Sequence, residues 1–267
     1  MRVARFAAAD GEPRYGMVEL AQDCGEHPET IAVVSADPLA GPVHYTGERL
    51  LLADVRLLAP VLPRSKVVGI GKNYADHAAE MGTGIPAEPL VFLKPNTSVI
   101  GPGEAIVKPP ECERLDYEGE LAVVIGRICR RVPIVRAADV IFGYTVGNDV
   151  TARDLQDRDG QWTRGKGYDT FTVLGPWMVT HLGLDEAAHL DITTKLNGEV
   201  KQSESTAAML NPIPRLIEFV SSFTTLLPGD VILTGTPAGI GPMLPGDSVS
   251  VSVSEIGTLA NPVVAEA

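Results

Sequence analysis

The sequence predicts a mainly β protein with a few short helices, preceded by a small N-terminal domain. Short apolar runs recur along the chain, and each is bounded by glycine or proline. Residues 248–253 alternate serine with valine, which is the period of a half-exposed strand. Helical spacing of apolar residues is rare. With 267 residues, 45% of them hydrophobic and 21% charged, the chain has ordinary globular composition and can bury a sizeable core.

The first predicted element is a β-hairpin. Two strand-like runs, residues 2–7 and 14–20, flank the turn signal Asp10-Gly11. The chain then passes through proline and glycine without strong periodicity until about residue 60. We therefore predict a small N-terminal α+β domain over residues 1–60 and a main domain over residues 61–267.

The main domain is predicted to consist largely of short strands. Their sequences are KVVGIG, LVFLKP, GELAVVIG, FGYTVGNDV, DITTKLNGEV, GDVILTG and SVSVSV. One helix is expected to begin near Asn73. Another is expected to begin at 212–214, where an early proline suits a first helical turn. Its expected buried positions follow helical spacing: Leu216, Ile217, Val220 and Phe223.

Composition and charge exclude several classes of partner. The net charge is −12, the pI is about 4.9 and aromatic residues make up only 5%, so a nucleic-acid-binding surface is not expected. No apolar run is long enough to span a membrane, and the N-terminus does not resemble a signal peptide. The three cysteines, Cys24, Cys112 and Cys129, are widely spaced. We therefore expect a reduced, cytoplasmic location.

The strongest chemical pattern is the acidic run 116–120, Asp-Tyr-Glu-Gly-Glu, which leads directly into an apolar strand. Alternate residues of a strand share a face, so Glu118 and Glu120 would project side by side, and Asp116 could join them. Adjacent carboxylates resist burial, and a hard divalent cation would resolve that conflict. Spacing alone fits equally well with solvated acids on an exposed strand edge.

A second pattern begins at Asn148-Asp149, at the end of an apolar run. A dense set of polar residues follows, including Arg153, Gln156 and Lys166. Such density between two apolar strands suits an active-site loop. Taken alone, the pattern favours an exposed amphipathic helix with salt bridges.

Two further patterns are weaker. His77 and Glu80 are three residues apart on a predicted helix, where a carboxylate can raise the basicity of a histidine; the alternative is a surface ion pair. The loop Gly-Thr-Pro-Ala-Gly at 235–239, which contains Thr236, follows a strand and can offer N–H groups and a hydroxyl to a carboxylate. The alternative there is an ordinary turn.

Taken in order, these motifs resemble the fumarylacetoacetate hydrolase family. The matching stretches run from about residue 66 to the end of the chain, and their joint order is far more specific than any single motif. They are GKNYADHAAEMG, PLVFLKPNTSVIGPGE, DYEGELAVVIG, FGYTVGNDVTARDLQ, WTRGKGYDTFTVLGPW and LLPGDVILTGTPAGIG.

The resemblance implies mixed β-sheets rolled around a barrel-like core, usually assembled as a homodimer. It implies a Mg²⁺ or Mn²⁺ site, with Ca²⁺ as an alternative, held by Glu118, Glu120 and Asp149. It places Lys166 beside the metal and makes His77 and Glu80 the water-activating pair. It also places three residues around the substrate: Arg153, Gln156 and Thr236.

The activity that the resemblance implies is chemistry through an enolate next to a 2-oxo acid, on a small 2-oxo or enol dicarboxylate. The leading hypothesis is hydrolysis of a C–C bond in an acylpyruvate or fumarylacetoacetate-type substrate. The alternatives within the family are an oxaloacetate decarboxylase and an isomerase or decarboxylase of ring-opened dicarboxylates from aromatic catabolism. A non-enzymatic β module with a structural Ca²⁺ site is the alternative from another class.

Overall fold

The structure is a computed structural model that describes residues 1–267 except 10, 22–27, 83 and 267. It confirms the mainly β fold with mixed sheets. Within the described residues the strands form three sheets, and the largest is open at both ends rather than closed into a barrel. No helix in the described part of the chain is long and apolar enough to cross a membrane.

The largest sheet has twelve strands and runs through both halves of the chain. Its order is β4-β3-β2-β1-β14-β12-β11-β17-β6-β7, with β5 added to β1 and β8 added to β14. In chain order the strands are β1 (Arg2–Ala7), β2 (Pro13–Glu19), β3 (Thr30–Val34), β4 (Tyr45–Leu51), β5 (Arg56–Leu58), β6 (Val67–Gly71), β7 (Leu90–Lys94), β8 (Val99–Ile100), β11 (Gly119–Ile125), β12 (Ile141–Asp149), β14 (Thr172–Val179) and β17 (Val231–Leu233).

Two smaller sheets complete the β structure. A three-stranded sheet has the order β13-β10-β18, and a five-stranded sheet has the order β16-β15-β19-β20-β9. Their strands are β9 (Ile106–Lys108), β10 (Leu115–Tyr117), β13 (Thr151–Ala152), β15 (Asp191–Leu196), β16 (Glu199–Ser205), β18 (Gly241–Met243), β19 (Ser248–Val253) and β20 (Gly257–Ala265).

The helices are short and lie between strands. The α-helices are α2 (Ala75–Glu80), α3 (Arg153–Asp159), α4 (Thr163–Gly167), α5 (Leu184–Ala187) and α6 (Ile213–Phe223), and the 3₁₀ turns are η1 (Leu52–Asp54), η2 (Asn96–Ser98), η3 (Ile134–Val140) and η4 (Thr206–Ala208). Helix α6 begins where predicted and buries Leu216, Ile217 and Val220. Phe223 is half exposed, contrary to the prediction that it is buried, because it lies at the end of the helix, where its ring meets Phe219 edge to face.

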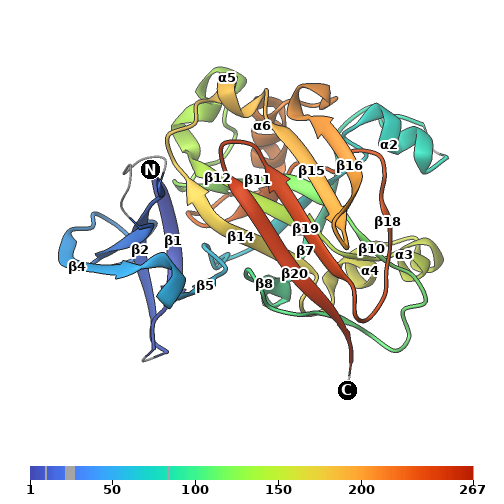
Figure 1. The fold of residues 1–267 in the computed structure, drawn as a ribbon. Coiled ribbons are helices and arrows are strands. Elements are labelled where there is room, and N and C mark those ends of the chain that lie inside the picture. The colour runs from blue at the N-terminus through green and yellow to red at the C-terminus, as the bar shows by residue number, and fades with distance from the viewer. Residues whose placement is uncertain (10, 22–27, 83, 267) are drawn as a thin grey trace.

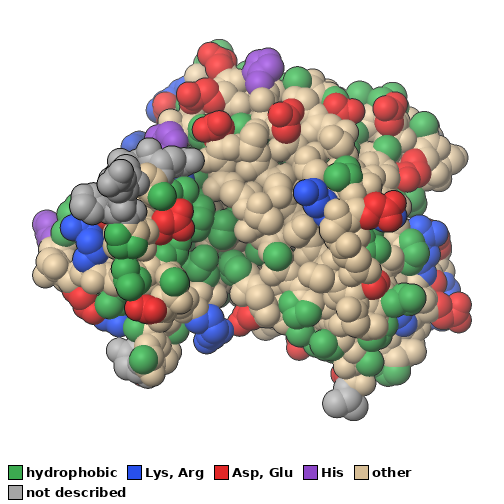
Figure 2. Space-filling model, in the orientation of Figure 1, with side chains coloured by type: hydrophobic (Ala, Val, Ile, Leu, Met, Phe, Trp, Pro, Cys, Tyr) green, Lys and Arg blue, Asp and Glu red, His purple; other side chains and the backbone are tan. Residues whose placement is uncertain are grey.

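The main core lies where the five-stranded sheet packs on the centre of the large sheet. Every residue of β11 and of β14 is buried, and these strands contact β15, β19 and β20. The predicted alternation in β19 is confirmed, since Val249, Val251 and Val253 point into this core. The opposite face of the five-stranded sheet carries mostly small polar side chains and backbone (Figures 1 and 2). The two central strands are thus covered on both faces, which fixes the backbone that carries the site.

The N-terminal segment is more regular than its sequence suggests. The hairpin β1–β2 is confirmed, while Asp10 of its predicted turn and Cys24 lie outside the described residues. Between residues 30 and 58 the structure has three further strands, where no periodicity was recognised. All five strands lie at one side of the molecule (Figure 1), and β1 pairs with β14 at Arg2↔Val179 and Val3↔Met178. The segment therefore extends the large sheet.

Candidate active site

Three buried carboxylates meet at the centre of the molecule. Glu118, Glu120 and Asp149 are each at most 4% exposed, and one oxygen from each lies within 4.8 Å of the others. Glu120 belongs to β11 and Asp149 ends β12, and these strands are paired so that Gly119 faces Asn148. The pairing of the two strands therefore brings together acids that are separated by about thirty residues in the sequence.

Glu118 does not lie within a continuous strand, contrary to the sequence-based expectation. It occupies the break between β10 and β11, which belong to different sheets. Its N–H donates to Asn148 Oδ1 at 2.9 Å, and the N–H of Gly119 donates to Gln202 Oε1 at 3.0 Å. Side-chain oxygens thus satisfy two backbone N–H groups where the chain changes sheet, while the carbonyl of Glu118 still accepts from the N–H of Asp149 at 2.9 Å. Both glutamates therefore reach one site.

Cationic side chains surround the carboxylates. Lys166 Nζ donates to Glu118 Oε2 at 2.6 Å and to Asp149 Oδ2 at 2.8 Å, so it bridges two of the three acids. Arg153 donates through Nη2 to Glu118 and through Nε to Asp116 Oδ2 at 3.0 Å. Both cations come from the polar segment after β12, which forms the short helices α3 and α4. The inward-facing side chains of this segment therefore fit the hypothesis of an active-site loop.

Asp116 lies next to the three acids but outside their group. Its carboxylate accepts one hydrogen bond from Arg153 and one from Arg114 Nε, the latter at 2.9 Å. Two guanidinium groups thus satisfy this carboxylate, which explains why it does not join the other three.

Sequence reasoning missed Lys94. This lysine ends β7 and is fully buried, with Nζ donating to Asp149 Oδ1 and, at 3.4 Å, to the carbonyl of Val150. Burial lowers the pKa of Lys94, an effect that Asp149 opposes and Lys166 reinforces. The signal was present in the sequence, because LVFLKP places a lysine at the end of an otherwise apolar strand, and a buried lysine needs an anionic partner.

The two glutamates have opposite electrostatic environments. Burial acts to raise the pKa of Glu118, but Lys166, Arg153 and His77 outweigh it and hold that pKa well below its usual range. Burial and the neighbouring Asp149 and Glu118 raise the pKa of Glu120 well above its usual range. Glu120 Oε2 accepts a 2.7 Å hydrogen bond from the N–H of Gly235. No salt bridge to Glu120 occurs among the residues that the structure describes.

This arrangement fits a divalent cation. Glu120 is a buried acid without a cationic partner in the described structure, and it faces two other carboxylates. Lys166 Nζ already occupies a position between Glu118 and Asp149, where a positive charge is shared by two acids. All three side chains offer hard oxygen atoms, which are the ligands that Mg²⁺, Mn²⁺ and Ca²⁺ prefer.

His77 and Glu80 meet on helix α2, beside the acids. His77 Nδ1 lies 3.3 Å from Glu80 Oε2, and His77 is 5% exposed. Glu80 also accepts from the N–H of Gly239 through both of its oxygens, each at 3.2 Å. The predicted pair is therefore formed, and it is tied to the glycine-containing loop 235–239.

The donors of the loop 235–239 bond to carboxylates and a carbonyl of the protein itself. The hydroxyl of Thr236 donates to the carbonyl of Gly119 at 2.9 Å and accepts from Gln202 Nε2 at 2.8 Å. Gly235 has a φ of +99°, and a Cβ there would lie 2.7 Å from Asn73 Cβ, so glycine is required for its N–H to reach Glu120.

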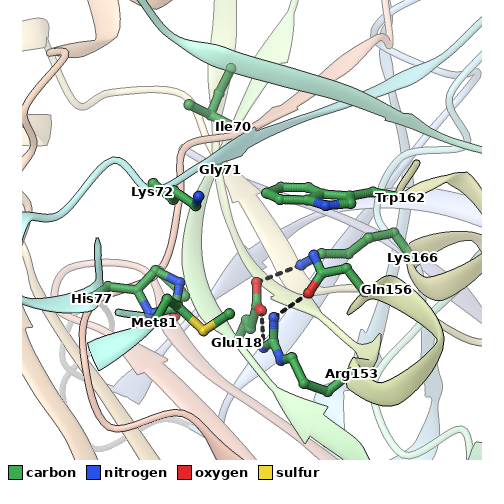
Figure 3. Close-up of a pocket in the computed structure, with 11 residues that line it drawn as sticks. Ile70, Gly71, Lys72, His77, Met81, Glu118, Arg153, Gln156, Trp162 and Lys166 are labelled. Atoms are coloured by element: carbon green, nitrogen blue, oxygen red, sulfur yellow. Dashed lines mark hydrogen bonds and ion pairs between the residues drawn. The ribbon is translucent and has the colours of Figure 1, made fainter. Parts of the chain in front are cut away.

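A small polar pocket joins these groups (Figure 3). His77 and Met81 lie on one side, Arg153, Gln156 and Lys166 lie on the other, and Glu118 lies between them. Gln156 Oε1 accepts from Arg153 Nη1 at 2.6 Å, and Thr236 also lines the pocket. The free volume is about 20 Å³, which is room for one or two water molecules. The structure therefore places eight of the nine sequence-predicted site residues in this pocket or in the adjoining group of three carboxylates, and Glu80 joins them through His77. The pocket as it stands is too small for an organic acid.

A buried carboxylate triad with lysine and arginine counter-charges, on a mainly β scaffold, defines a class of protein with a candidate metal site beside a pocket lined by cationic side chains. Residues 66–264 match the family model described as fumarylacetoacetate (FAA) hydrolase C-terminal, and residues 1–60 match the one described as Rv2993c-like, N-terminal. The chain therefore belongs to the fumarylacetoacetate hydrolase family.

Two relatives illustrate the similarity of the chain to known proteins. The chain is 52% identical to Protein Rv2993c of Mycobacterium tuberculosis over 264 residues, which cover 99% of this chain and 98% of that one. It is 44% identical over 221 residues to the oxaloacetate tautomerase YisK of Bacillus subtilis, with 79% and 73% of the two chains covered.

Two solved structures are also informative. A 5-carboxymethyl-2-hydroxymuconate delta-isomerase from Mycobacterium smegmatis is 49% identical with a TM-score of 0.89, and each chain is covered completely. A fumarylpyruvate hydrolase from Pseudomonas aeruginosa, solved in complex with Mn²⁺ and pyruvate, is 32% identical with a TM-score of 0.73, over 77% of this chain and 91% of that one.

Proposed function

We propose that this protein is a divalent-metal-dependent enzyme that moves a proton at the carbon next to a 2-oxo acid, interconverting the enol and keto forms of a short 2-oxo dicarboxylate. The observation that carries the proposal is the cluster of three buried carboxylates beside a closed pocket that also contains the His77–Glu80 pair. Relatives named as a tautomerase and as an isomerase, at 44% and 49% identity, support this class of reaction.

The charge balance of the site supports a dianionic substrate. The three acids face three buried cations, Lys94, Lys166 and Arg153, while Asp116 has Arg114 as a further partner. These formal charges cancel, so a bound divalent cation would leave two positive charges. Two carboxylate groups on one small molecule would neutralise them.

The metal and the protein side chains would have separate tasks. Bound by Glu118, Glu120 and Asp149, Mg²⁺ or Mn²⁺ would act as a Lewis acid that stabilises negative charge developing on a 2-oxo acid. Lys166 and Arg153 line the same pocket and would bind and orient the substrate's anionic oxygens. His77, oriented by Glu80 through Nδ1, would carry the proton at Nε2, and Gln156 and Thr236 would contact the substrate.

Hydrolysis of a C–C bond is the second candidate function. Its support is the His77–Glu80 pair, which could take a proton from water, together with the relative named fumarylpyruvate hydrolase, whose structure contains Mn²⁺ and pyruvate. In that reaction water attacks the distal carbonyl and a pyruvate unit leaves as its enolate. Both candidates need the same stabilisation of negative charge, so the shared residues are compatible with either.

A substrate panel tests these proposals. Purified protein, stripped with chelator and reloaded with Mg²⁺ or Mn²⁺, would be assayed with enol-oxaloacetate, an acylpyruvate and keto-oxaloacetate. We expect metal-dependent loss of the enol absorbance, and little activity in Glu118→Gln. Acylpyruvate cleavage without tautomerisation would favour the hydrolase, and release of CO₂ would favour the decarboxylase. Metal binding without turnover of any of these would favour a non-enzymatic metal module.

We also propose that the protein is a homodimer, as expected for the family. Exposed apolar side chains on η3 and the end of α6, Val135 and Phe223, are candidates for burial in an interface. Multi-angle light scattering at micromolar concentration should give twice the chain mass of 28.3 kDa. A mass of 28.3 kDa at that concentration would refute the dimer.

A further inference from the structure

The two buried lysines hold opposite oxygens of the same carboxylate. Lys94 Nζ contacts Asp149 Oδ1, while Lys166 Nζ contacts Asp149 Oδ2 at 2.8 Å. Lys166 also contacts Glu118 and lines the pocket, so it stands on the side of the candidate metal ligands. Lys94 approaches from β7, bonds to no other carboxylate in the described structure and does not line the pocket.

From this division we infer that Lys94 is a positioning residue that restricts Asp149 to one oxygen as a metal ligand and thereby keeps a coordination position open for the substrate. The inference rests on the proposed metal-dependent function. A cation bound between the three acids would displace Lys166 from Asp149 Oδ2, because Lys166 lines the pocket and can shift toward it. Lys94 is fully buried outside the pocket, so its contact with Asp149 Oδ1 would remain.

The open position matters because a 2-oxo acid offers two adjacent oxygens. Magnesium and manganese favour six ligands, and three carboxylates that give one oxygen each leave three positions. If Asp149 gave both oxygens, one of those positions would be lost. A hydrogen-bonded ammonium group on Oδ1 is a direct means of preventing this.

The inference predicts that replacing Lys94 increases the affinity for the metal, which is the opposite of the usual effect of removing a residue that contacts a metal ligand. Outer partners of metal ligands usually strengthen binding, and their loss costs about 10–100-fold in affinity. Lys94 is a cation, so its loss would both remove repulsion from the metal and free a second oxygen. Lys94→Met should therefore bind Mn²⁺ more tightly, by roughly tenfold, while its affinity for oxalate falls by a similar factor.

The experiment uses Mn²⁺ on the full-length protein. Electron paramagnetic resonance gives the Mn²⁺ affinity, and water proton relaxation reports how many waters the bound ion retains. We expect Lys94→Met to hold one water fewer than the wild type, and its KM for the substrate to rise. Lys94→Gln keeps a hydrogen-bond donor without the charge, so it should keep more of the wild-type water count, and it serves as a second variant if the methionine protein does not fold.

A matched control is available in the same fold. Lys66 also pairs with a fully buried aspartate, at 2.7 Å from Asp230, and neither residue lines the pocket. Lys66→Met should lower the melting temperature without changing either Mn²⁺ measurement. An unchanged water count in Lys94→Met, or weaker Mn²⁺ binding than the wild type in either Lys94 variant, would overturn the inference while leaving the proposed function intact. Failure of the wild type to bind Mn²⁺ would overturn the proposed function itself.

Discussion

The carboxylates of the site differ sharply in how many cationic partners the protein provides for them. Glu118 has a lysine and an arginine as partners. Glu120 accepts a hydrogen bond from the N–H of Gly235 and forms no salt bridge in the described structure, and burial with two neighbouring carboxylates raises its pKa well above the usual range. Such an acid must either take up a proton or carry an unpaired charge, and at neutral pH both lower the stability of the metal-free fold. The same environment is suited to binding a cation.

Replacing Glu120 should separate stability from metal binding. Glu120→Gln is neutral without taking up a proton and keeps an oxygen for the N–H of Gly235, so at neutral pH the metal-free protein should gain on the order of 1 kcal/mol. That gain would raise its melting temperature by about 2–4 °C. Scanning calorimetry with and without Mn²⁺ checks this. The wild type should be stabilised by Mn²⁺ and the variant should not; a variant that melts below the metal-free wild type would contradict the expectation.

The role of His77 can be separated from that of the metal site. Removing a group that moves a proton typically lowers the rate of that step by about 10²–10⁴-fold. His77→Ala should therefore lower kcat/KM for tautomerisation and for acylpyruvate hydrolysis by that order. Loss of CO₂ from oxaloacetate needs no attacking water and should fall clearly less. Glu118→Gln should lower all of these activities, and equal losses in His77→Ala would show that His77 only positions the substrate or the helix.

Residue identities at the site were largely predictable, and their partners were not. The order of the motifs led to Glu118, Glu120 and Asp149, because each lies in a stretch with a distinctive local pattern. The position of Lys94 at the end of an apolar strand indicates a need for an anionic partner, but it cannot identify Asp149, which lies 55 residues away. The guanidinium of Arg153 reaches both Glu118 and Asp116. Its direction was likewise not predictable, because it depends on how helix α3 packs against strand β10.

At the scale of elements, the short helix α2 carries His77 to the pocket. It has six residues, and Glu80 bonds it to the loop 235–239 through the N–H of Gly239. Gly82, just beyond it, has a φ of +63° and open space around its Cα. Because the pocket holds only one or two waters, substrate entry requires a segment to move, and α2 is the segment best placed to do so.

Hydrogen exchange can detect this motion. Residues 75–82 should exchange more slowly when oxalate and Mg²⁺ are bound, because closure over the ligand would hold α2 against the 235–239 loop. Helix α6 packs its apolar face into the core and provides the internal reference. Glu80→Gln should exchange faster than the wild type in this segment without ligand. Equal exchange of residues 75–82 with and without oxalate and Mg²⁺ would count against a lid.

Strands and helices were predicted correctly where a single spacing of apolar residues runs through the whole element. The Ser–Val alternation of β19 and the apolar spacing of α6 were of this kind. The change of sheet at Glu118 was not predictable, because the side chains that accept its N–H and that of Gly119, Asn148 and Gln202, are far away in the sequence. Leu-Pro-Gly-Asp occurs at 227–230 and again at 244–247, and in each copy the aspartate accepts a hydrogen bond from the N–H of the leucine three residues earlier.

At the scale of the whole molecule, the N-terminal segment shares a core with the rest of the chain. Val3 and Met17 belong to one buried cluster together with Leu174 and Met178. Two family models divide the chain at residues 60–66, and sequence composition predicts a boundary there as well. Composition could not show that β1 pairs with β14, because that pairing joins residues separated by more than 170 positions.

We predict that the two segments unfold together despite their separate family models. Val3 and Met178 face each other across the β1–β14 pair and are almost fully buried, so a cavity on either side weakens the same interface. Met178→Ala should cost about 2–5 kcal/mol and Val3→Ala somewhat less. Each should lower one melting transition by about 2–4 °C per kcal/mol. Calorimetry should give equal calorimetric and van't Hoff enthalpies for one unfolding unit. If Val3→Ala instead separates a low-temperature transition from an unchanged main one, residues 1–60 are an independent domain that merely rests on β14.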